Sequence, residues 1–222
     1  NSAAYTNVED AEDEGSEMND LVNHQGAKYL AEAPNTLDIP FVHVSTDYVF
    51  ADNQKEGKLE TDATEQGANA YGEAKRKGEL AALAVNQQSY ILRTSWLYGE
   101  GGKNLVDTIV RLANERDSLS FVENEIGVPT YTKDLAELIA FVIIHIEKFE
   151  PGIYHAVNEG SCSRYEQARL ILDVLQSKTQ LGKSKLADFP RKAHIPNYSI
   201  LKNTKLPALR SWEYALTEYI LE

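Results

Sequence analysis

The pair Tyr71 and Lys75 carries the most specific chemistry in this sequence, with the spacing Tyr-x-x-x-Lys. Side chains four residues apart share one face of a helix. A phenol, whose pKa is about 10, is a poor proton donor at neutral pH unless a cation stabilises its phenolate, and a lysine one helical turn away supplies that cation. Thr46 can hydrogen-bond the same substrate oxygen. The pattern therefore indicates proton transfer with a bound substrate.

The position of Thr46 separates this pair from a chance match. Chance alone gives roughly one such spacing in a chain of this composition. A second one, Tyr198 to Lys202, lies in a Pro- and Asn-rich stretch without helical period, so we discard it. Thr46 instead ends an apolar, β-branched run that predicts a buried strand. Ligands bind at the carboxyl ends of parallel strands, which favours a site over the alternative of an exposed tyrosine and lysine on a surface helix.

Strands and helices are expected to alternate along the chain, the strands as apolar runs and the helices as apolar residues at helical spacing. Asn69 is expected to cap one helix, and Ser163 with Glu166 forms a capping-box pattern before another. Pro34 is expected to stop the first helix. The stretch 178–210 shows no period, so no element is predicted there. The predicted strands are 39–50, 89–98, 119–122 and 153–158, and the predicted helices are 9–33, 70–85, 103–116, 132–148, 163–177 and 211–221.

This alternation predicts an α/β fold: a Rossmann-like, doubly wound parallel sheet with helices on both faces, followed by a smaller C-terminal lobe. We expect residues 1–150 to form the sheet domain that carries the catalytic residues, with a crossover into the second lobe near 99–131. Residues 151–222 are expected to form mainly the substrate-binding lobe.

Composition argues against several classes of protein and partner. The chain has 222 residues, of which 22 are basic and 34 acidic, so its formal net charge is −12. No stripe of lysine or arginine interrupts that charge, which makes nucleic acid and anionic membranes poor partners. Without a membrane-length apolar run or a signal peptide, the expected location is the cytoplasm. Cys162 is the only cysteine, so no internal disulfide forms, and no Cys/His cluster predicts a metal site.

Six segments resemble, in order, the extended short-chain dehydrogenase/reductases and, within them, the dTDP-4-dehydrorhamnose reductase family. The resemblance runs from residue 1 to about residue 220, and it implies an enzyme that reduces the 4-keto group of a dTDP-linked 6-deoxy sugar with NADPH or NADH. The segments are N-S-A-A-Y-T-N-V-E-D-A-E, V-N-H-Q-G-A-K-Y-L-A, H-V-S-T-D-Y-V-F, N-A-Y-G-E-A-K-R-K-G-E, L-R-T-S-W-L-Y-G and G-V-P-T-Y-T-K-D-L-A.

The resemblance also implies roles for individual residues. Tyr71 would donate a proton to the C4 oxygen of the sugar, Lys75 would tune Tyr71 and hold the nicotinamide ribose, and Thr46 would assist at the carbonyl. The residues implied to contact the cofactor are Ala3, Ala4, Thr6, Tyr71 and Lys75, and those implied on the nucleotide-sugar side are Val8, Thr46, Asp47 and Trp96.

Each further residue also has a plainer interpretation. Ala3 and Ala4 can be close-packed strand residues, Asp47 an ordinary turn carboxylate and Trp96 a core residue. Cys162 is expected to be a small structural residue. The Gly99-Glu-Gly-Gly run and Gly182-Lys183-Ser184 match no phosphate-binding fingerprint and are assigned to turns.

The sequence departs from the family in its cofactor-binding start. No G-x-x-G-x-x-G or G-x-G-x-x-G turn occurs, although a dinucleotide fold places the pyrophosphate on such a turn. More than one βαβ unit is missing before Asn1 if the sheet is to be complete. The chain is therefore expected to be a fragment of a longer protein or to hold the cofactor only weakly.

Smaller departures concern the substrate side. Asn124 and Glu125 stand where the family commonly has Asp and Gln, and a carboxylate in place of an amide is only an acceptor. Ile195 stands where an Arg-Pro pair is usual, and an apolar side chain cannot pair with phosphate. Some relatives assemble through acidic residues and a divalent metal such as Mg²⁺, and those residues cannot be placed here. A homodimer remains a possible assembly.

Two alternatives to the reductase stay open. One keeps the fold but changes the reaction to dehydration or epimerisation of a sugar nucleotide. Dehydratases of this superfamily have a glutamate after the Thr-Asp pair, and here Tyr48 occupies that place. The other is a non-catalytic binding protein, similar to the regulatory subunit of methionine adenosyltransferase. The intact Thr46, Tyr71 and Lys75 argue against it, and the absent Gly-rich turn argues for it.

Overall fold

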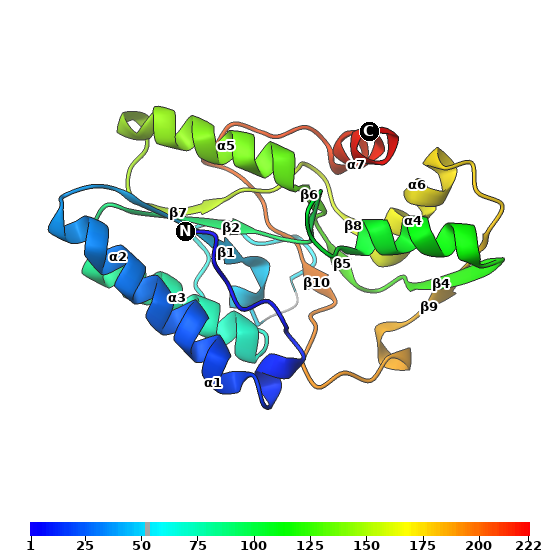
Figure 1. Cartoon of the computed structure of the whole chain (residues 1–222), viewed down its shortest axis with the longest axis horizontal. Coiled ribbons are helices and arrows are strands. Elements are labelled where there is room, and N and C mark those ends of the chain that lie inside the picture. The colour runs from blue at the N-terminus through cyan, green and yellow to red at the C-terminus, as the bar shows by residue number, and fades with distance from the viewer. Residues whose placement is uncertain (52–53) are drawn as a thin grey trace.

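A three-stranded parallel sheet forms the centre of the larger lobe in the computed structural model, which describes residues 1–51 and 54–222 (Figure 1). Its strands are β1 (Phe41–Thr46), β2 (Ser89–Thr94) and β7 (Gly152–His155), in the order β1-β2-β7. The last residues of β1 and β2, Thr46 and Thr94, are register partners. The expected buried parallel strands are thereby confirmed, and two threonines lie side by side at one sheet edge. The strand predicted over 39–50 is shorter than expected, because η3 (Asp47–Val49) follows directly after Thr46.

Helices cover both faces of this sheet, as Figure 1 shows. On one face, Tyr90 and Leu92 of β2 pack against Leu135 and Leu138 of α5 (Thr132–Ile144). On the other, Ile91 packs with side chains of α2 (Ala27–Thr36) and α3 (Ala70–Val85). Because successive side chains of a strand point to opposite faces, an unbroken apolar run serves both layers. The doubly wound α/β prediction is correct.

The first predicted helix is broken into shorter pieces. They are η1 (Asp10–Glu12), α1 (Ser16–Asn19), the π-helical η2 (Asp20–Gly26) and α2. The prediction that Pro34 stops the helix is wrong, because α2 continues to Thr36. A proline removes one backbone hydrogen bond, and that loss is small so close to the end, where the Pro34 carbonyl accepts the N–H groups of Leu37 and Ile39.

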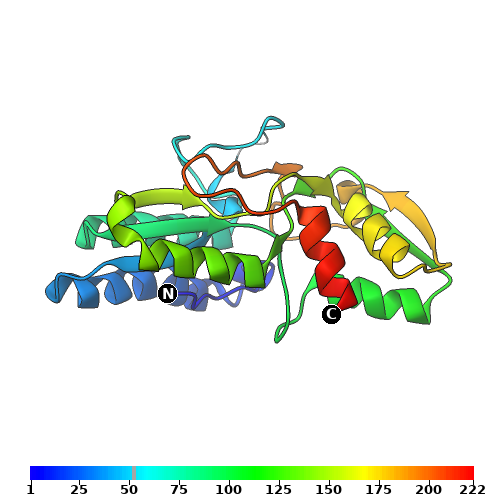
Figure 2. The same cartoon turned by 90° about the horizontal axis from the view of Figure 1, so that it is seen from above.

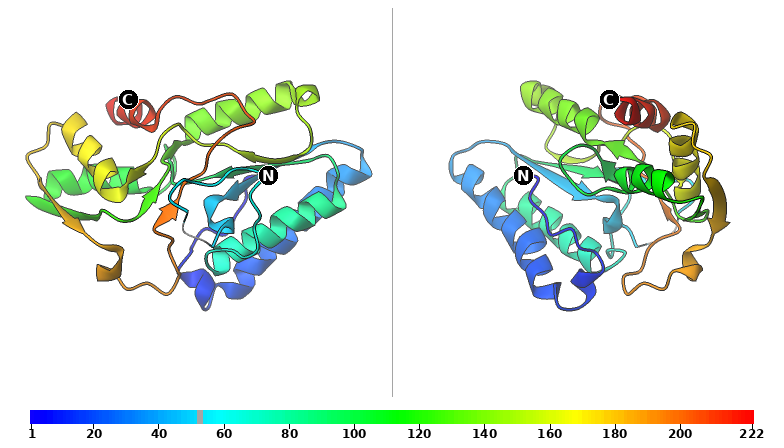
Figure 3. Two further views of the ribbon diagram at one scale, coloured as in Figure 1. Left: turned by 180° about the vertical axis from the view of Figure 1, so that it is seen from behind. Right: turned by 45° about the vertical axis from the view of Figure 1, so that its right-hand side comes forward.

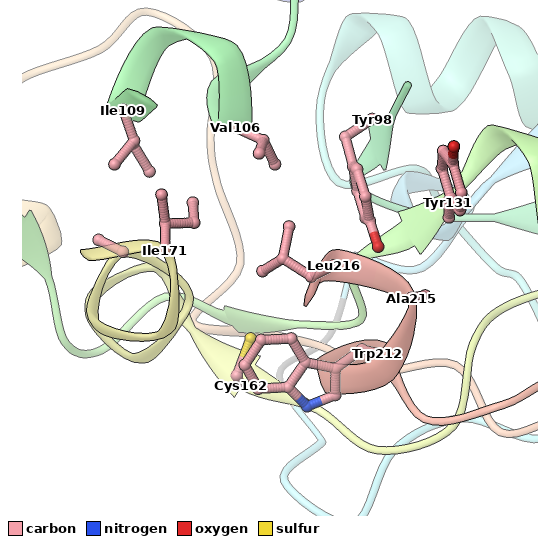
Figure 4. Packing of buried hydrophobic residues seen from close by; sticks show 10 residues of the cluster. Tyr98, Val106, Ile109, Tyr131, Cys162, Ile171, Trp212, Ala215 and Leu216 are labelled. Atoms are coloured by element: carbon pink, nitrogen blue, oxygen red, sulfur yellow. The ribbon is translucent and has the colours of Figure 1, made fainter. Parts of the chain in front are cut away.

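A second lobe lies beside the sheet lobe (Figures 2 and 3). It contains α4 (Leu105–Glu115), β4 (Ser118–Val122), α6 (Arg164–Val174), β9 (Gln180–Ser184) and α7 (Trp212–Leu221). Side chains from α4, α6 and α7 form its core, and Figure 4 shows Cys162 close to Trp212 inside that core. Cys162 is buried and its thiol is free, as expected of a structural residue.

Two strand predictions need correction. The strand predicted over 89–98 is interrupted after Thr94, because Trp96 adopts a positive φ of 45° before β3 (Leu97–Tyr98) begins. The stretch 178–210, for which no element was predicted, contains β9, η5 (Leu186–Asp188) and β10 (Tyr198–Ser199). Their pairing partners lie far away in the chain, so no local period marks them. The remaining short elements are η3 (Asp47–Val49), β5 (Ile126–Gly127), β6 (Thr130–Tyr131), η4 (Ile146–Lys148) and β8 (Cys162–Ser163).

The division of the chain at residue 150 stays a prediction. β7 follows that residue and still pairs with β2 in the central sheet, while α4 and β4 precede it and pack with α6. Among the described residues, no helix is both long and apolar enough to cross a membrane.

Candidate functional site

A cavity of about 250 Å³ opens at the carboxyl ends of β1 and β2. This is the edge at which ligands bind in open parallel sheets. Its lining combines the N-terminal segment, both strand ends and α3, and consists of Ser2, Ala4, Thr6, Val44, Ser45, Thr46, Asp47, Tyr71, Lys75, Thr94, Ser95, Trp96 and Leu97. The structure thus brings the predicted catalytic residues together in one cavity.

The start of α3 fixes the position of Tyr71. Asn69 caps the helix as predicted, because its side-chain oxygen accepts the N–H of Gly72 at 2.9 Å. Gly72 lies against the backbone carbonyl of Tyr48, and a Cβ at this position would overlap that oxygen. Only glycine permits this approach. The contact brings Tyr71 close to the end of β1.

The hydroxyl of Thr46 links the strand end to Tyr71. It donates to Oδ1 of Asp47 at 2.9 Å and accepts the N–H of Tyr48 at 3.3 Å. Burial raises the pKa of Tyr71 to about 12, and a hydrogen bond with Thr46 acts in the opposite direction. Tyr71 is therefore protonated at neutral pH and can serve as a proton donor.

Lys75 is buried, with 2% of its surface exposed, and its ammonium donates to the carbonyl oxygen of Val44 at 2.7 Å. Burial lowers the pKa of Lys75 to about 8, although the Glu79 carboxylate raises it. Tyr71 and Lys75 line the same cavity. In the described structure, however, the ammonium is bonded to β1 and the phenol to Thr46, so the lysine is a neighbour of the phenol and no hydrogen bond joins them.

His43 was not identified from the sequence. Its Nε2 lies 3.4 Å from the Lys75 ammonium, and its Nδ1 lies 3.0 Å from the side-chain nitrogen of Asn1. Burial, followed by the positive charge of Lys75, lowers the pKa of His43 well below its ordinary value. A neutral imidazole therefore supports the ammonium. The available signal was its place in β1, two residues from Phe41 and on the same face.

Asp47 is a buried carboxyl group at the cavity wall. Burial raises its pKa to about 6, while hydrogen bonds with Ser199 and Thr46 lower it. An ordinary turn carboxylate would be hydrated, so burial favours the predicted role in binding over the plainer interpretation.

Trp96 forms another wall of the cavity and is held from two sides. A Cβ on Gly127 would overlap the indole, and the Cζ atom of Arg164 lies 3.2 Å from the centre of the ring. Nε of Arg164 donates to the Glu125 carboxylate at 2.9 Å. Sequence patterns did not identify Arg164, because its partners come from distant segments.

The N-terminal residues divide into two groups. Ala4 and Thr6 line the cavity, as expected of residues near a cofactor. Ala3 is exposed, its N–H bonded to the Asn1 side chain, and neither Ala3 nor Val8 is among the lining residues. The contacts of all four residues with cofactor and substrate stay predictions.

The described residues fit one end of a dinucleotide better than the other. Ser45, Thr94 and Trp96 line the cavity, and each carries a buried polar atom (Oγ, Oγ1 and Nε1) that has no partner among the described residues. Buried polar atoms need hydrogen bonds, so a ligand rich in hydroxyl groups, such as a ribose or a hexose, suits this site. No glycine-rich turn for a pyrophosphate occurs in the sequence, and no described cluster of three or more acidic, His or Cys side chains suits a metal.

Comparison with known proteins is consistent with this geometry. The profile of the RmlD substrate binding domain matches residues 1–222. The spore coat polysaccharide biosynthesis protein SpsK of Bacillus subtilis is 38% identical, with 100% of this chain and 78% of SpsK covered. The dTDP-4-dehydrorhamnose reductase of Aggregatibacter actinomycetemcomitans is 41% identical over 93% of this chain and 72% of that protein. The crystal structure of the Bacillus anthracis dTDP-4-dehydrorhamnose reductase in complex with NADP matches with a TM-score of 0.90 and 35% identity, over 99% of this chain and 78% of that one.

Proposed function

The chain belongs to the family of the RmlD substrate binding domain, and from this premise we propose that it reduces dTDP-4-dehydrorhamnose to dTDP-L-rhamnose. The hydride comes from NADPH or NADH. Relatives that carry the name dTDP-4-dehydrorhamnose reductase, and the NADP complex of one of them, support this activity. The observation that carries the proposal is the gathering of Tyr71, Thr46 and Lys75 around one cavity at the strand ends.

Tyr71 supplies the proton in this reaction. When the cofactor is bound, its nicotinamide supplies a hydride to C4 of the sugar, and negative charge develops on the C4 oxygen. An alkoxide is a stronger base than a phenolate, so proton transfer from Tyr71 to that oxygen is favourable even with the pKa of Tyr71 at about 12. Thr46 orients the phenol.

Lys75 and Asp47 are proposed to bind hydroxyl groups of the cofactor and the sugar next to Tyr71 and Thr46. The Lys75 ammonium provides positive charge next to the cavity and an N–H group for a ribose hydroxyl. Asp47 lies in the same wall as Thr46 and is placed to accept from a sugar hydroxyl. Both side chains are buried, so these interactions are stronger than they would be in water.

Tyr48 favours reduction over dehydration. An elimination needs a base, and the position after Asp47 holds a phenol ring that packs edge-on against Tyr71, with ring centres 6.3 Å apart. Burial raises the pKa of Tyr48, so this side chain is a poor base.

A Tyr71→Phe variant tests the proposal. We expect turnover with dTDP-4-dehydrorhamnose and NADPH to fall by about 10²–10⁴-fold, the usual contribution of a general acid. Tyr29→Phe is the control, because Tyr29 is 60% exposed on α2. Affinity for dTDP should be the same in both variants. Retained turnover in Tyr71→Phe would show that another group donates the proton, and wild-type protein that binds dTDP without turnover would favour a non-catalytic binding protein.

Three finer points belong to the same proposal. The protein is proposed to act in the cytoplasm, where its single free thiol needs no oxidising compartment. A homodimer is proposed and is tested by light scattering. Residues 151–222 are proposed to contribute mainly to substrate binding.

A further inference from the structure

A diphosphate-linked sugar must bind to a chain whose net charge of −12 repels it. Local cations are therefore required beside the catalytic cavity. Lys75 is buried and already bonded to Val44. Lys192 is exposed, but its ammonium pairs with Asp13 and its N–H is bonded to Glu9. Neither lysine is free to bind an anion.

Arg164 meets the requirement through its contact with Trp96, a residue of the cavity wall. Its guanidinium stacks on Trp96, which lines the cavity, and Nε pairs with Glu125, which is itself buried. Nη1 has only a 3.4 Å contact with Gln167. Within the described parts of the chain, no group accepts a hydrogen bond from Nη2, so one edge of the guanidinium remains open.

Arg191 lies in a second hollow, of about 500 Å³, that Asn124, Phe189 and Ile195 also line. The hollow is linked to Arg164 through Asn124, because the next residue in the chain, Glu125, pairs with Arg164. Arg191 is exposed and has no ion-pair partner in residues 1–51 and 54–222.

Arg164 and Arg191 both influence the pKa of Tyr48. Burial raises the pKa of Tyr48, the carboxylates of Asp47 and Glu125 raise it further, and Arg164 and Arg191 both lower it. Both guanidinium groups thus act on Tyr48, although one comes from helix α6 and the other from a loop.

We propose that Arg164 and Arg191 bind the diphosphate of the nucleotide-sugar substrate, and that Glu125 reduces the effective charge of Arg164. This inference rests on the proposed function for the identity of the sugar. The planar guanidinium donates paired N–H groups that match phosphate oxygens, and two arginines balance the charge of a diphosphate. The two arginines supply the positive charge that is missing at Ile195, where the family usually has an Arg-Pro pair.

Calorimetric titration with dTDP tests the site without any turnover. We expect Arg164→Gln and Arg191→Gln each to weaken dTDP binding about tenfold or more, the effect of losing a charge-assisted hydrogen bond. Thymidine, which lacks phosphate, should bind both variants as it binds the wild type. Arg169→Gln is the matched control, because Arg169 lies on the same helix α6 with 59% of its side chain exposed.

Glu125→Gln separates anion binding from a merely structural role of Arg164. The amide still accepts from Arg164 but no longer cancels its charge, so dTDP should bind several-fold more tightly. If Arg164 only supports Trp96, this variant will bind dTDP no better than the wild type.

Unchanged dTDP affinity in either arginine variant would overturn the proposal, as would an equal loss of thymidine binding. If Arg164→Gln unfolds because Trp96 loses its support, Arg191→Gln decides the matter, since Arg191 makes no hydrogen bond or ion pair within the described residues. A protein without reductase activity that still shows these arginine effects would refute the proposed function alone. An active reductase whose KM is the same in both arginine variants would refute the diphosphate site alone.

Discussion

We compare the free energy of unfolding of an Asp47→Asn variant with that of the wild type. The difference should favour the variant more at neutral pH than at mildly acidic pH. Burial raises the pKa of this carboxyl from 3.8 to about 6. The folded state therefore holds a proton that the unfolded state has released between these two values. Ionised Asp47 consequently destabilises the fold above pH 6, and this cost disappears below pH 3.8.

The magnitude follows from the two pKa values. One pKa unit corresponds to about 1.4 kcal/mol, so the full cost of ionising Asp47 in the folded protein is about 3 kcal/mol. At pH 5 the linkage relation gives about 2 kcal/mol, and at pH 7.5 about 3 kcal/mol. The stability difference between Asp47→Asn and the wild type should then increase by about 1 kcal/mol from pH 5 to pH 7.5. Any constant effect of the amide cancels in this comparison.

Urea unfolding of both proteins at pH 5 and pH 7.5 measures this change. Asp117→Asn is the control, because Asp117 is exposed and the same chemical change leaves the interior untouched. Its stability difference from the wild type should be the same at both pH values. If the stability difference between Asp47→Asn and the wild type does not vary with pH, the argument that the ionised, buried carboxylate destabilises the fold is refuted. The variant should also raise KM for the sugar nucleotide, since Asp47 lines the cavity.

Three further outcomes follow from the packing around the site. Turnover should fall as the pH rises through about 8, where buried Lys75 loses its proton, and Lys75→Arg should move this limb of the kcat/KM profile upward because arginine stays charged. Gly72→Ala should lower the thermal midpoint, since its Cβ would overlap a backbone carbonyl, whereas Gly102→Ala should not, because nothing lies within 4 Å of the added atom. Glu79→Gln should cost about 3–5 kcal/mol in urea unfolding by leaving buried Arg93 without its carboxylate; a loss below about 1 kcal/mol would contradict that role.

The sequence alone determined the order of strands and helices in the sheet lobe. Unbroken apolar runs at β1 and β2 are required of strands buried on both faces, and Asn69 and Ser163 cap their helices through contacts within three residues. Such signals are local, so they can be recognised without the fold. The pairing of Tyr71 with Thr46 was also predictable, since it needs only the spacing and the rule that parallel strands end at one edge.

Only the tertiary structure decided which other groups surround that pair. His43 supports Lys75 across 32 residues, and Arg164 reaches Glu125 across 39. The strand β9 pairs with β4 although no period marks it. The physical reason is the same in each case. Charge, burial and strand pairing depend on which atoms meet in space, and a sequence shows only which residues are neighbours along the chain.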